Sequence, residues 1–254
     1  MNFEFSEEQQ LLREQARGFL TEHCSTSVVR AVLDSNEDWD ASLWKKVAGM
    51  GGTATVIPEA YGGLGLSYYE LAILAEEMGR SAAPLPFSSS LYLASEAIRH
   101  FGNESQKSEW LPKLASGECV ATVAMAERAG RLVLDQLQTR RTDSQITGHK
   151  VPVADASVAD VAVVLARSDQ GLEACLVPLK QEGVSISPVL TFDTSRGHSA
   201  VTFDRAAAQA LGDAPVDPAD WERVIDGAAV LFAWEQLGVA ESALIQARDY
   251  ALQR

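Results

Sequence analysis

The chain has 254 residues, of which 46% are hydrophobic, so it can bury one large core or two smaller ones. Its 35 acidic and 21 basic residues give a net charge of −14, which disfavours nucleic acids and anionic membrane surfaces as partners. We expect a soluble cytoplasmic protein, because neither a signal pattern nor an apolar run long enough to span a bilayer is found. Cys24, Cys119 and Cys175 lack metal-ligand or disulfide-framework spacing, so we expect reduced thiols and no metal site.

Residues 1–118 have the apolar periodicity of helices, and we expect them to form an N-terminal all-helical domain. The first predicted helix begins after Ser6, a favoured N-cap residue, and two glutamates follow it at the positive end of the helix dipole. Further helices are predicted after Asp40 and at 91–100 and 104–114.

Within this domain, residues 58–80 combine a glycine-rich turn with a regular amphipathic helix. The glycines allow positive φ angles or a close approach of the backbone, and the helix carries glutamates beside its apolar face. On this pattern alone, we favour plain architecture over a ligand site. The residues are Gly62, Gly63 and Gly65 in the turn, Leu71, Leu74 and Met78 on the apolar face, and Glu70, Glu76 and Glu77.

The spacing of the apolar residues changes after residue 118, from the helical period to the alternation of strands. Short β-branched or alternating runs, separated by Gly, Asp and Ser turns, predict a middle domain of mostly antiparallel strands over 119–214. An acidic linker with two prolines, 213–220, leads into a helical segment over 215–254. One apolar helix of this length cannot bury its own surface, so we expect another chain, or self-association, to cover it.

Several blocks of the sequence carry a family resemblance through their order and spacing. Residues 3–20, 58–80 and 101–118 resemble the N-terminal helical domain of the acyl-CoA dehydrogenases, flavoenzymes that desaturate acyl-CoA thioesters. Residues 146–167 resemble the middle β-domain of that family, and 237–254 resemble the first long helix of its C-terminal bundle. The resemblance implies an α+β fold with a helical domain, an antiparallel β-domain and a truncated helical bundle, and it implies FAD as the cofactor.

In the family, the flavin ring rests against a loop with a hydroxyl residue and a strand with an aromatic and a hydroxyl residue. By this resemblance, the cofactor-binding positions here are Ala124, Met125 and Ala126 in the loop and Pro152, Val153 and Ala154 in the strand. Ala126 and Ala154 replace the hydroxyl residues, and Pro152 replaces the aromatic residue. Because none of the three has a side-chain donor, and proline also lacks a backbone N–H, we expect a degenerate flavin site.

The resemblance assigns no catalytic residue to this chain. The family takes its catalytic glutamate either from the late part of the bundle or from the long first helix, where the corresponding position here is Ala228. Glu222 and Glu235 lie on that helix out of register, and we expect them to be solvent-facing or helix-end charges. Arg196 is expected to form a structural salt bridge with Asp193.

The function implied by the resemblance is FAD-dependent α,β-desaturation of an acyl-CoA thioester, in lipid or steroid catabolism, within a homo- or hetero-oligomer. The chain looks like a subunit with eroded flavin contacts that binds FAD weakly or only at a subunit interface. Its expected partners are the acyl-CoA substrate and a full-length acyl-CoA dehydrogenase subunit or another copy of itself. Two alternatives stay open: a catalytically inactive structural or regulatory subunit, and a non-functional fragment.

Overall fold

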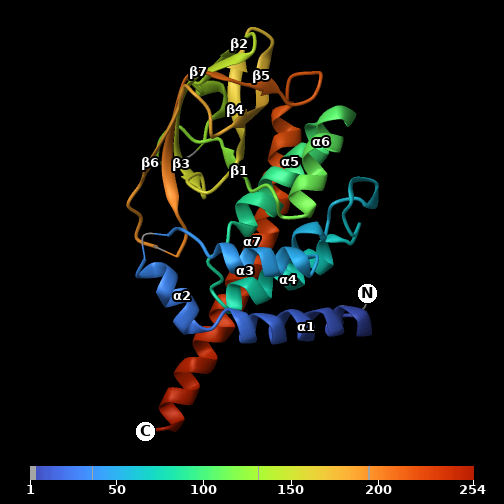
Figure 1. Cartoon of the computed structure of the whole chain (residues 1–254), viewed down its shortest axis with the longest axis vertical. Helices are drawn as coiled ribbons and strands as arrows, with labels where there is room; N and C mark the ends of the chain where they lie inside the picture. The colour runs from blue at the N-terminus through green and yellow to red at the C-terminus, as the bar shows by residue number, and fades with distance from the viewer. Residues whose placement is uncertain (1–3, 36, 131, 194) are drawn as a thin grey trace.

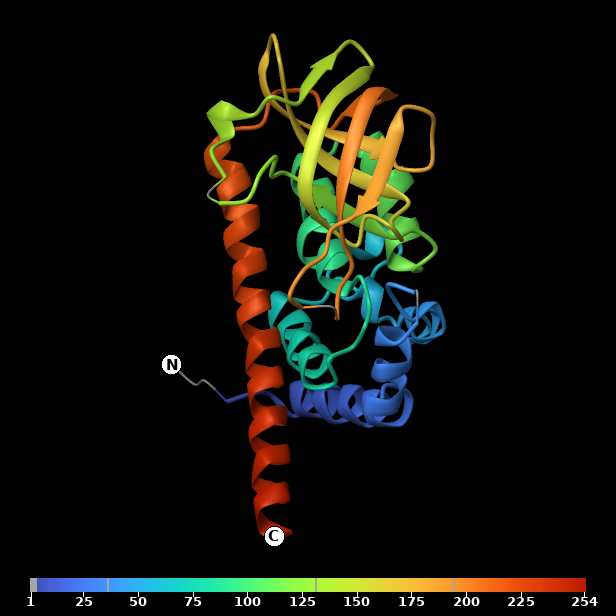
Figure 2. The same ribbon diagram turned by 90° about the vertical axis from the view of Figure 1, so that its left-hand side faces the viewer.

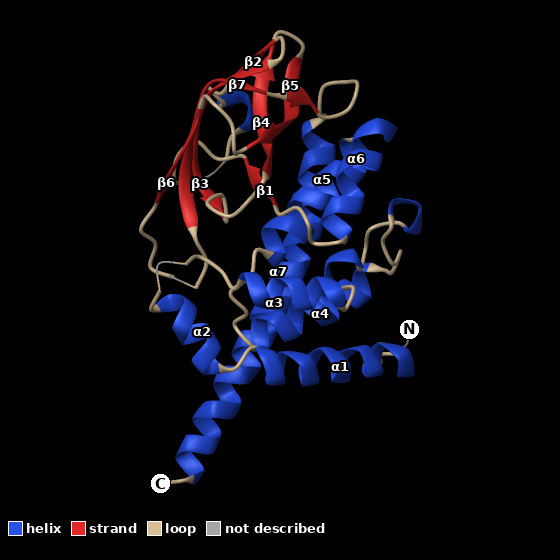
Figure 3. Cartoon of the chain, viewed as in Figure 1, coloured by secondary structure: helices blue, strands red, loops and turns tan. Residues whose placement is uncertain are grey.

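The computed structural model describes residues 4–35, 37–130, 132–193 and 195–254, which form a helical part, a curled β-sheet and a long C-terminal helix (Figures 1 and 3). The helices are α1 (Glu7–His23), α2 (Thr26–Leu33), α3 (Ala41–Gly49), α4 (Tyr68–Arg80), α5 (Glu96–Phe101), α6 (Glu104–Ala115) and α7 (Pro218–Leu252). A π-helix, η3 (Ser88–Ser95), runs directly into α5. The strands are β1 (Ala121–Ala124), β2 (Arg140–Thr142), β3 (Gln145–Ala154), β4 (Val161–Ser168), β5 (Gly171–Pro178), β6 (Val184–Pro188), β7 (His198–Ala207) and β8 (Gln209–Ala210).

Side-chain caps confirm the predicted starts of two helices. The Ser6 hydroxyl accepts a hydrogen bond from the backbone N–H of Gln9 at 3.2 Å, and the Gln9 side chain accepts one from Ser6 N at 3.1 Å. Asp40 starts α3, since its carboxylate accepts from the backbone N–H groups of Ser42 and Leu43, both at 2.9 Å. The eight-residue α2 was not predicted, because its sequence TSVVRAVL is rich in β-branched residues that lower helix propensity.

The helix that follows the glycine turn, α4, lies at the centre of the helical part. Glu70 forms a capping box at its start, so this acidic residue has a structural role. Glu76 and Glu77 are only 4% and 0% exposed, because Arg13 and Arg17 of α1 reach their carboxylates at 2.8 and 2.7 Å. The two ion pairs therefore join α1 to α4. The predicted apolar face is buried, as expected, through Leu71, Leu74 and Met78.

The sheet has the strand order β6-β7-β3-β2-β4-β5-β8, and β1 pairs with β4 outside this path. Most pairings are antiparallel, as predicted, whereas β4 pairs in parallel with β1 and β2. Alternate residues of β4 belong to two apolar clusters, one with α1, α3 and α4 and the other with α5 and α6. Both faces of β4 are therefore covered, which explains its continuous apolar sequence. The cysteines are free and buried, as expected: Cys24, Cys119 and Cys175.

The 35-residue helix α7 runs along one side of the molecule, from the sheet to beyond α1 (Figure 2). Asp217 caps its start, and its buried residues recur at helical spacing: Trp221, Val224, Ala228, Leu231, Glu235 and Gly238. The backbones of α7 and α4 meet at Gly238 and Gly79. A Cβ on Gly238 would lie 1.9 Å from the carbonyl oxygen of Glu76, so only glycine fits this crossing.

The length of α7 corrects one expectation from the sequence. By length and composition, this helix is apolar enough to cross a bilayer, whereas no such run was expected. One helix continues without a break through Glu235 and Glu241, so these two charges do not end its apolar stretch. Length and composition are weak evidence for a membrane span, since a helix that packs against partners meets the same criterion.

Candidate functional site

The structure brings the two predicted flavin-contact segments together, although 28 positions in the sequence separate Ala126 from Ala154. The backbone N–H of Val151 in β3 donates to the carbonyl oxygen of Ala126 at 2.8 Å. In β1, the Thr122 hydroxyl donates to the carbonyl oxygen of Ala154 at 2.6 Å. The end of β1 and the end of β3 therefore form one junction, which we call the β1–β3 junction.

The six predicted contact residues occupy different depths at the β1–β3 junction. Ala124 and Val153 are buried in the core, at 0% and 1% exposure, and cannot touch a ligand without a rearrangement. Met125, Ala126 and Ala154 are partly buried, and Pro152, which follows a cis peptide bond, is exposed. The accessible positions therefore include all three at which the sequence lacks the expected hydroxyl and aromatic side chains.

A buried ion pair holds the β1–β3 junction. Lys150, at 0% exposure, donates from Nζ to the carbonyl oxygen of Met125 and to Oε1 of Glu127, both at 3.0 Å. Burial lowers the pKa of Lys150 to about 8. Burial alone would raise the pKa of Glu127, but hydrogen bonds from Thr139, Gln138 and Lys150 outweigh it and lower this pKa to about 2. The pair fixes the loop after β1 against β3.

A hollow of about 490 Å³ opens beside Glu127. Its wall includes Ala126, Arg128, Asp135 and Gln136, and much of the lining is polar. This hollow is therefore the opening next to the β1–β3 junction in which a polar ligand could lie.

The structure contradicts the sequence-based expectations for Glu235 and Arg196. Glu235 is 9% exposed, and it forms an ion pair with Arg196 from the loop before β7. Asp193, the expected partner of Arg196, instead accepts hydrogen bonds from the backbone and hydroxyl of Ser195 at 2.9 and 2.6 Å. Asp193 was expected to pair with Arg196 because it is close in sequence, but Glu235 on the buried face of α7 is the actual partner. Glu222 is exposed, as expected.

Further polar groups surround this ion pair. Arg196 also donates to the hydroxyl of Ser88 in the π-helix at 2.6 Å. Burial raises the pKa of Glu235, and the charge of Arg196 opposes that change. Among the described residues, the buried Tyr92 hydroxyl and Oε2 of Glu235 lack a hydrogen bond of standard geometry, although the two side chains lie close enough to interact electrostatically. The cluster joins the helical part, the sheet and α7, and it was missed although Glu235 falls in the buried register of α7.

Ala228, which the resemblance assigns to the alternative catalytic-base position, carries no acidic group. Ala228 is 2% exposed and presents only a methyl group. Glu235 lies seven residues, or two helical turns, further along the same face, about 10 Å away along the helix axis. Arg196 holds the Glu235 carboxylate at that distance, so Glu235 does not replace the acidic group that is missing at position 228.

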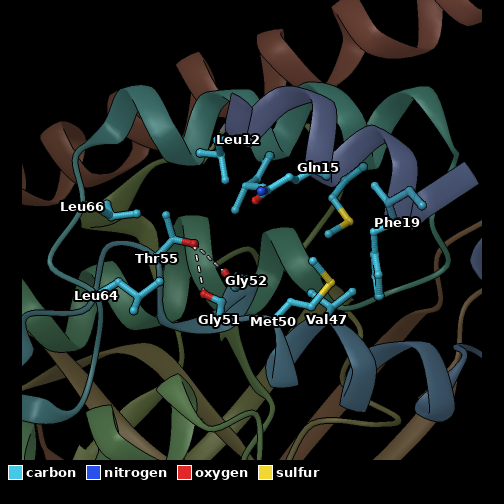
Figure 4. A pocket seen from close by; sticks show the side chains of 14 residues that line it. Leu12, Gln15, Phe19, Val47, Met50, Gly51, Gly52, Thr55, Leu64 and Leu66 are labelled. Carbon is cyan, nitrogen blue, oxygen red and sulfur yellow. Dashed lines mark hydrogen bonds between the residues drawn. The ribbon is translucent and has the colours of Figure 1, made fainter. Parts of the chain in front are cut away.

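A separate apolar cavity of about 100 Å³ lies between α1, α3, the turn 51–66 and α4 (Figure 4). Leu12, Phe19 and Met50 are among its lining residues, and Thr55 satisfies its own hydroxyl by donating to Gly52 O at 2.9 Å. No titratable side chain lines the cavity. It can hold an apolar group, but it offers no acid or base for catalysis.

Comparisons with known proteins agree with this architecture. Residues 6–118 match the model of the acyl-CoA dehydrogenase N-terminal domain. The chain is 32% identical over 199 residues to mitochondrial isovaleryl-CoA dehydrogenase of Pongo abelii, covering 73% of this chain and 47% of that protein. It is 30% identical over 249 residues to acyl-CoA dehydrogenase IpdE2 of Mycobacterium tuberculosis, covering 98% and 65%. The chain thus spans about half of the first relative and about two thirds of the second.

Solved structures extend the agreement to the whole chain. A variant of the Tcur3481-Tcur3483 steroid ACAD has a TM-score of 0.85 and 31% identity, covering 98% of this chain and 67% of its own. Butyryl-CoA dehydrogenase of Megasphaera elsdenii has a TM-score of 0.90 at 22% identity, covering 100% and 71%, and at that identity it shows the fold alone. The fold predicted from the sequence is confirmed, and the chain belongs to the acyl-CoA dehydrogenase family.

Proposed function

We propose that this chain is a subunit of an FAD-dependent acyl-CoA dehydrogenase assembly, in which its own flavin contacts are degenerate. The observation that carries the proposal is the β1–β3 junction, where two distant segments meet and present Ala126, Pro152 and Ala154. An acyl-CoA dehydrogenase of Bacillus anthracis has been solved in complex with FAD, and we propose the same cofactor for this chain. Of the six junction positions, Met125, Ala126, Pro152 and Ala154 are the proposed flavin contacts, and the buried Ala124 and Val153 support them from behind.

The residues present at the junction fit the side-chain contacts of a flavin poorly. Ala126 and Ala154 have no donor, and Pro152 has neither a side-chain donor nor a backbone N–H. Each missing hydrogen bond makes the free energy of FAD binding less favourable by about 1 kcal/mol, so the loss of two hydroxyls weakens binding by roughly tenfold or more. We therefore propose weak FAD binding, or binding completed at a subunit interface, and derive no redox step for the chain alone.

Removal of the α-proton of an acyl-CoA needs a carboxylate at the reacting carbon. Ala228 cannot serve, and Glu235 is already paired with Arg196. In the proposed assembly, this base comes from outside residues 1–254, and these residues contribute the helical part, a sheet domain over 119–214 and the helix over 215–254. The proposed substrate is an acyl-CoA of lipid or steroid catabolism, in keeping with the steroid ACAD among the relatives, and the proposed compartment is the cytoplasm.

A catalytically inactive structural or regulatory subunit is the second candidate. The observation that favours it is the partly buried Arg196–Glu235 pair, in which the carboxylate on the buried face of α7 joins the loop before β7 to the helix. On this reading, the pair has a structural role, and the chain stabilises a competent partner without binding a ligand itself.

The two candidates differ in what the purified chain does with a full-length acyl-CoA dehydrogenase of the same organism. Visible absorption spectra and an artificial-acceptor assay with acyl-CoA are recorded for each protein alone and for the mixture. The first candidate predicts that the mixture binds more FAD than the partner alone does. The second predicts the same amount of bound FAD in the mixture and in the partner alone. Turnover by the lone chain contradicts both candidates.

A further inference from the structure

Asp155 is a buried carboxyl group without an ion-pair partner. Five carboxyl groups of the described chain are buried, those of Glu76, Glu77, Glu173, Glu235 and Asp155. An arginine contacts each of the four glutamates. Asp155, at 3% exposure directly after β3, has only a hydroxyl partner among the described residues, because Ser89 Oγ of η3 lies 2.6 Å from its Oδ2. An unpaired charge is costly in such a place, so the neutral form of Asp155 is favoured.

The hydrogen bonds of Ser89 also favour a protonated Asp155. The Ser89 hydroxyl lies 2.6 Å from Oδ2 of Asp155 and 3.2 Å from the carbonyl oxygen of Pro86. A hydroxyl has one hydrogen, so it can donate to only one of these two oxygens. An ionised Asp155 can only accept, and one of the two contacts would then lack a hydrogen. A protonated Asp155 donates to Ser89 instead, which leaves the Ser89 hydrogen for Pro86, and both contacts become hydrogen bonds.

The balance of charges around Asp155 has the same effect. Burial raises the pKa of Asp155 above its ordinary value of 3.8, and the charge of Asp38 adds to that rise. The hydrogen bond from η3 and the charges of Arg196 and His198 act in the opposite direction but do not outweigh burial. Arg196 is already paired with Glu235 of α7, and Asp155 raises the pKa of that glutamate as well. Two buried carboxyl groups thus share one guanidinium.

From this geometry, we infer that Asp155 is a neutral carboxylic acid in the folded protein and forms a pH-sensitive lock between η3, the end of β3 and the loop before β7. The backbone N–H of Asp155 donates to the carbonyl oxygen of Gly197 in that loop at 2.8 Å. Gly197 follows Arg196, whose guanidinium pairs with Glu235 of α7. The lock therefore connects the helical part, the sheet and α7.

Loss of the proton weakens this lock through charge repulsion. Asp155 then adds a third negative charge beside Asp38 and Glu235, whereas Arg196 is the one guanidinium among the described groups that face it. His198 adds a positive charge only when it is protonated. Three carboxylates around one arginine are not neutralised, and like charges in a buried place repel strongly. Raising the pH therefore loosens the loop before β7.

The ionisation of Asp155 is linked to unfolding in one direction. An exposed aspartate loses its proton near pH 3.8, whereas the folded protein keeps the proton of Asp155 to higher pH. The stabilisation from this proton is complete below pH 3.8 and is lost as the pH rises through the pKa of the folded state. Where only the folded protein holds the proton, this one group raises the unfolding constant by up to about tenfold per pH unit.

The test compares Asp155→Asn with the wild type by urea unfolding between about pH 5 and 8. An amide resembles a neutral carboxyl group and can donate to Ser89, and asparagine tolerates the positive φ of 54° at this position. The matched control is Asp143→Asn, because Asp143 also has a φ of 54° but is exposed. We expect the unfolding constant of the wild type to rise relative to that of Asp155→Asn by up to about tenfold per pH unit, and Asp143→Asn to follow the wild type within about twofold.

Parallel pH profiles for the wild type and Asp155→Asn would overturn the inference, because Asp155 would then titrate alike in the folded and the unfolded protein. Carbon-13 NMR of wild-type protein labelled in its aspartate carboxyl groups gives a second readout that needs no variant. One carboxyl carbon should keep the chemical shift of a protonated acid at about pH 6. A spectrum in which every aspartate is ionised at that pH would also overturn the inference.

The loosening of the loop is measured by native-state hydrogen exchange. The backbone N–H of Val189 donates to the carbonyl oxygen of His198 at 2.8 Å and reports on this loop. As the pH rises, its exchange should increase beyond the base-catalysed rate in the wild type but not in Asp155→Asn. An equal increase in both proteins would contradict the lock. None of these readouts involves FAD or acyl-CoA, so this inference stands or fails independently of the proposed function.

Discussion

The crossing of α4 and α7 makes a quantitative prediction for two glycines of the same helix. A Cβ on Gly238 would lie 1.9 Å from Glu76 O and 2.8 Å from Arg80 N, whereas a Cβ on Gly227 would meet nothing within 4 Å. Both obstacles at Gly238 are backbone atoms, so no side chain can rotate away, and Gly238→Ala must push the helices apart. Gly227→Ala changes only the backbone entropy of the unfolded chain and the helix propensity.

The two effects have opposite signs. Overpacking of this kind costs about 1–3 kcal/mol, and we expect the upper end because backbone atoms are involved. Replacing glycine by alanine within a helix gains about 1 kcal/mol at either position. We therefore expect Gly238→Ala to lower the free energy of unfolding by about 2 kcal/mol and Gly227→Ala to raise it by up to about 1 kcal/mol.

Urea unfolding followed by far-UV circular dichroism measures both variants against the wild type, with the slope checked for a common two-state transition. Equal stabilities for Gly238→Ala and Gly227→Ala would refute the reasoning, because they would show that α7 does not rest on the backbone of α4.

Three further predictions concern the ion pairs and the junction. Because hydrogen bonds hold the pKa of Glu127 at about 2, below its ordinary value of 4.5, the stability that this carboxylate contributes is complete above pH 4.5 and is lost as the pH falls toward 2. Between pH 4.5 and 2, the free energy of unfolding should therefore fall less steeply with pH for Glu127→Gln than for the wild type. Equal slopes for the two proteins would contradict the assigned pKa. Glu235→Ala leaves the partly buried Arg196 without its carboxylate partner and should cost about 2 kcal/mol, whereas the double variant Glu235→Leu with Arg196→Met should cost less, as urea unfolding of both will show. Ala126→Thr with Ala154→Thr should raise FAD affinity about tenfold, measured by flavin fluorescence, without creating turnover in the lone chain.

Much of the fold could be predicted because local signals and tertiary packing agree. Ser6 and Asp40 cap the helices that their side chains favour, and the alternating runs after residue 118 become strands. The strand β3 was the harder case. Lys150 and Val153 are both buried although they are three residues apart, because the pairing with β7 shifts register between them. Simple alternation cannot foresee such a shift.

The candidate site could be predicted only in part, for a physical reason. Ala126 and Ala154 were assigned to the flavin site by the family resemblance, and the structure brings their two segments together. The Arg196–Glu235 pair is different, because 39 positions separate its members and a glutamate on a helix is usually solvated. The signal that could have found it is the register of buried residues on α7, in which Glu235 replaces an apolar residue.

The central claim is that the flavin-contact positions of this family member have lost their side-chain donors, so that the lone chain does not hold FAD firmly. The most direct measurement is the ratio of FAD to protein after the purified chain is saturated with FAD and passed through gel filtration. The account predicts a ratio far below one for the lone chain, because Ala126, Pro152 and Ala154 provide no side-chain hydrogen bond. A stoichiometric yellow complex that survives the column would contradict it.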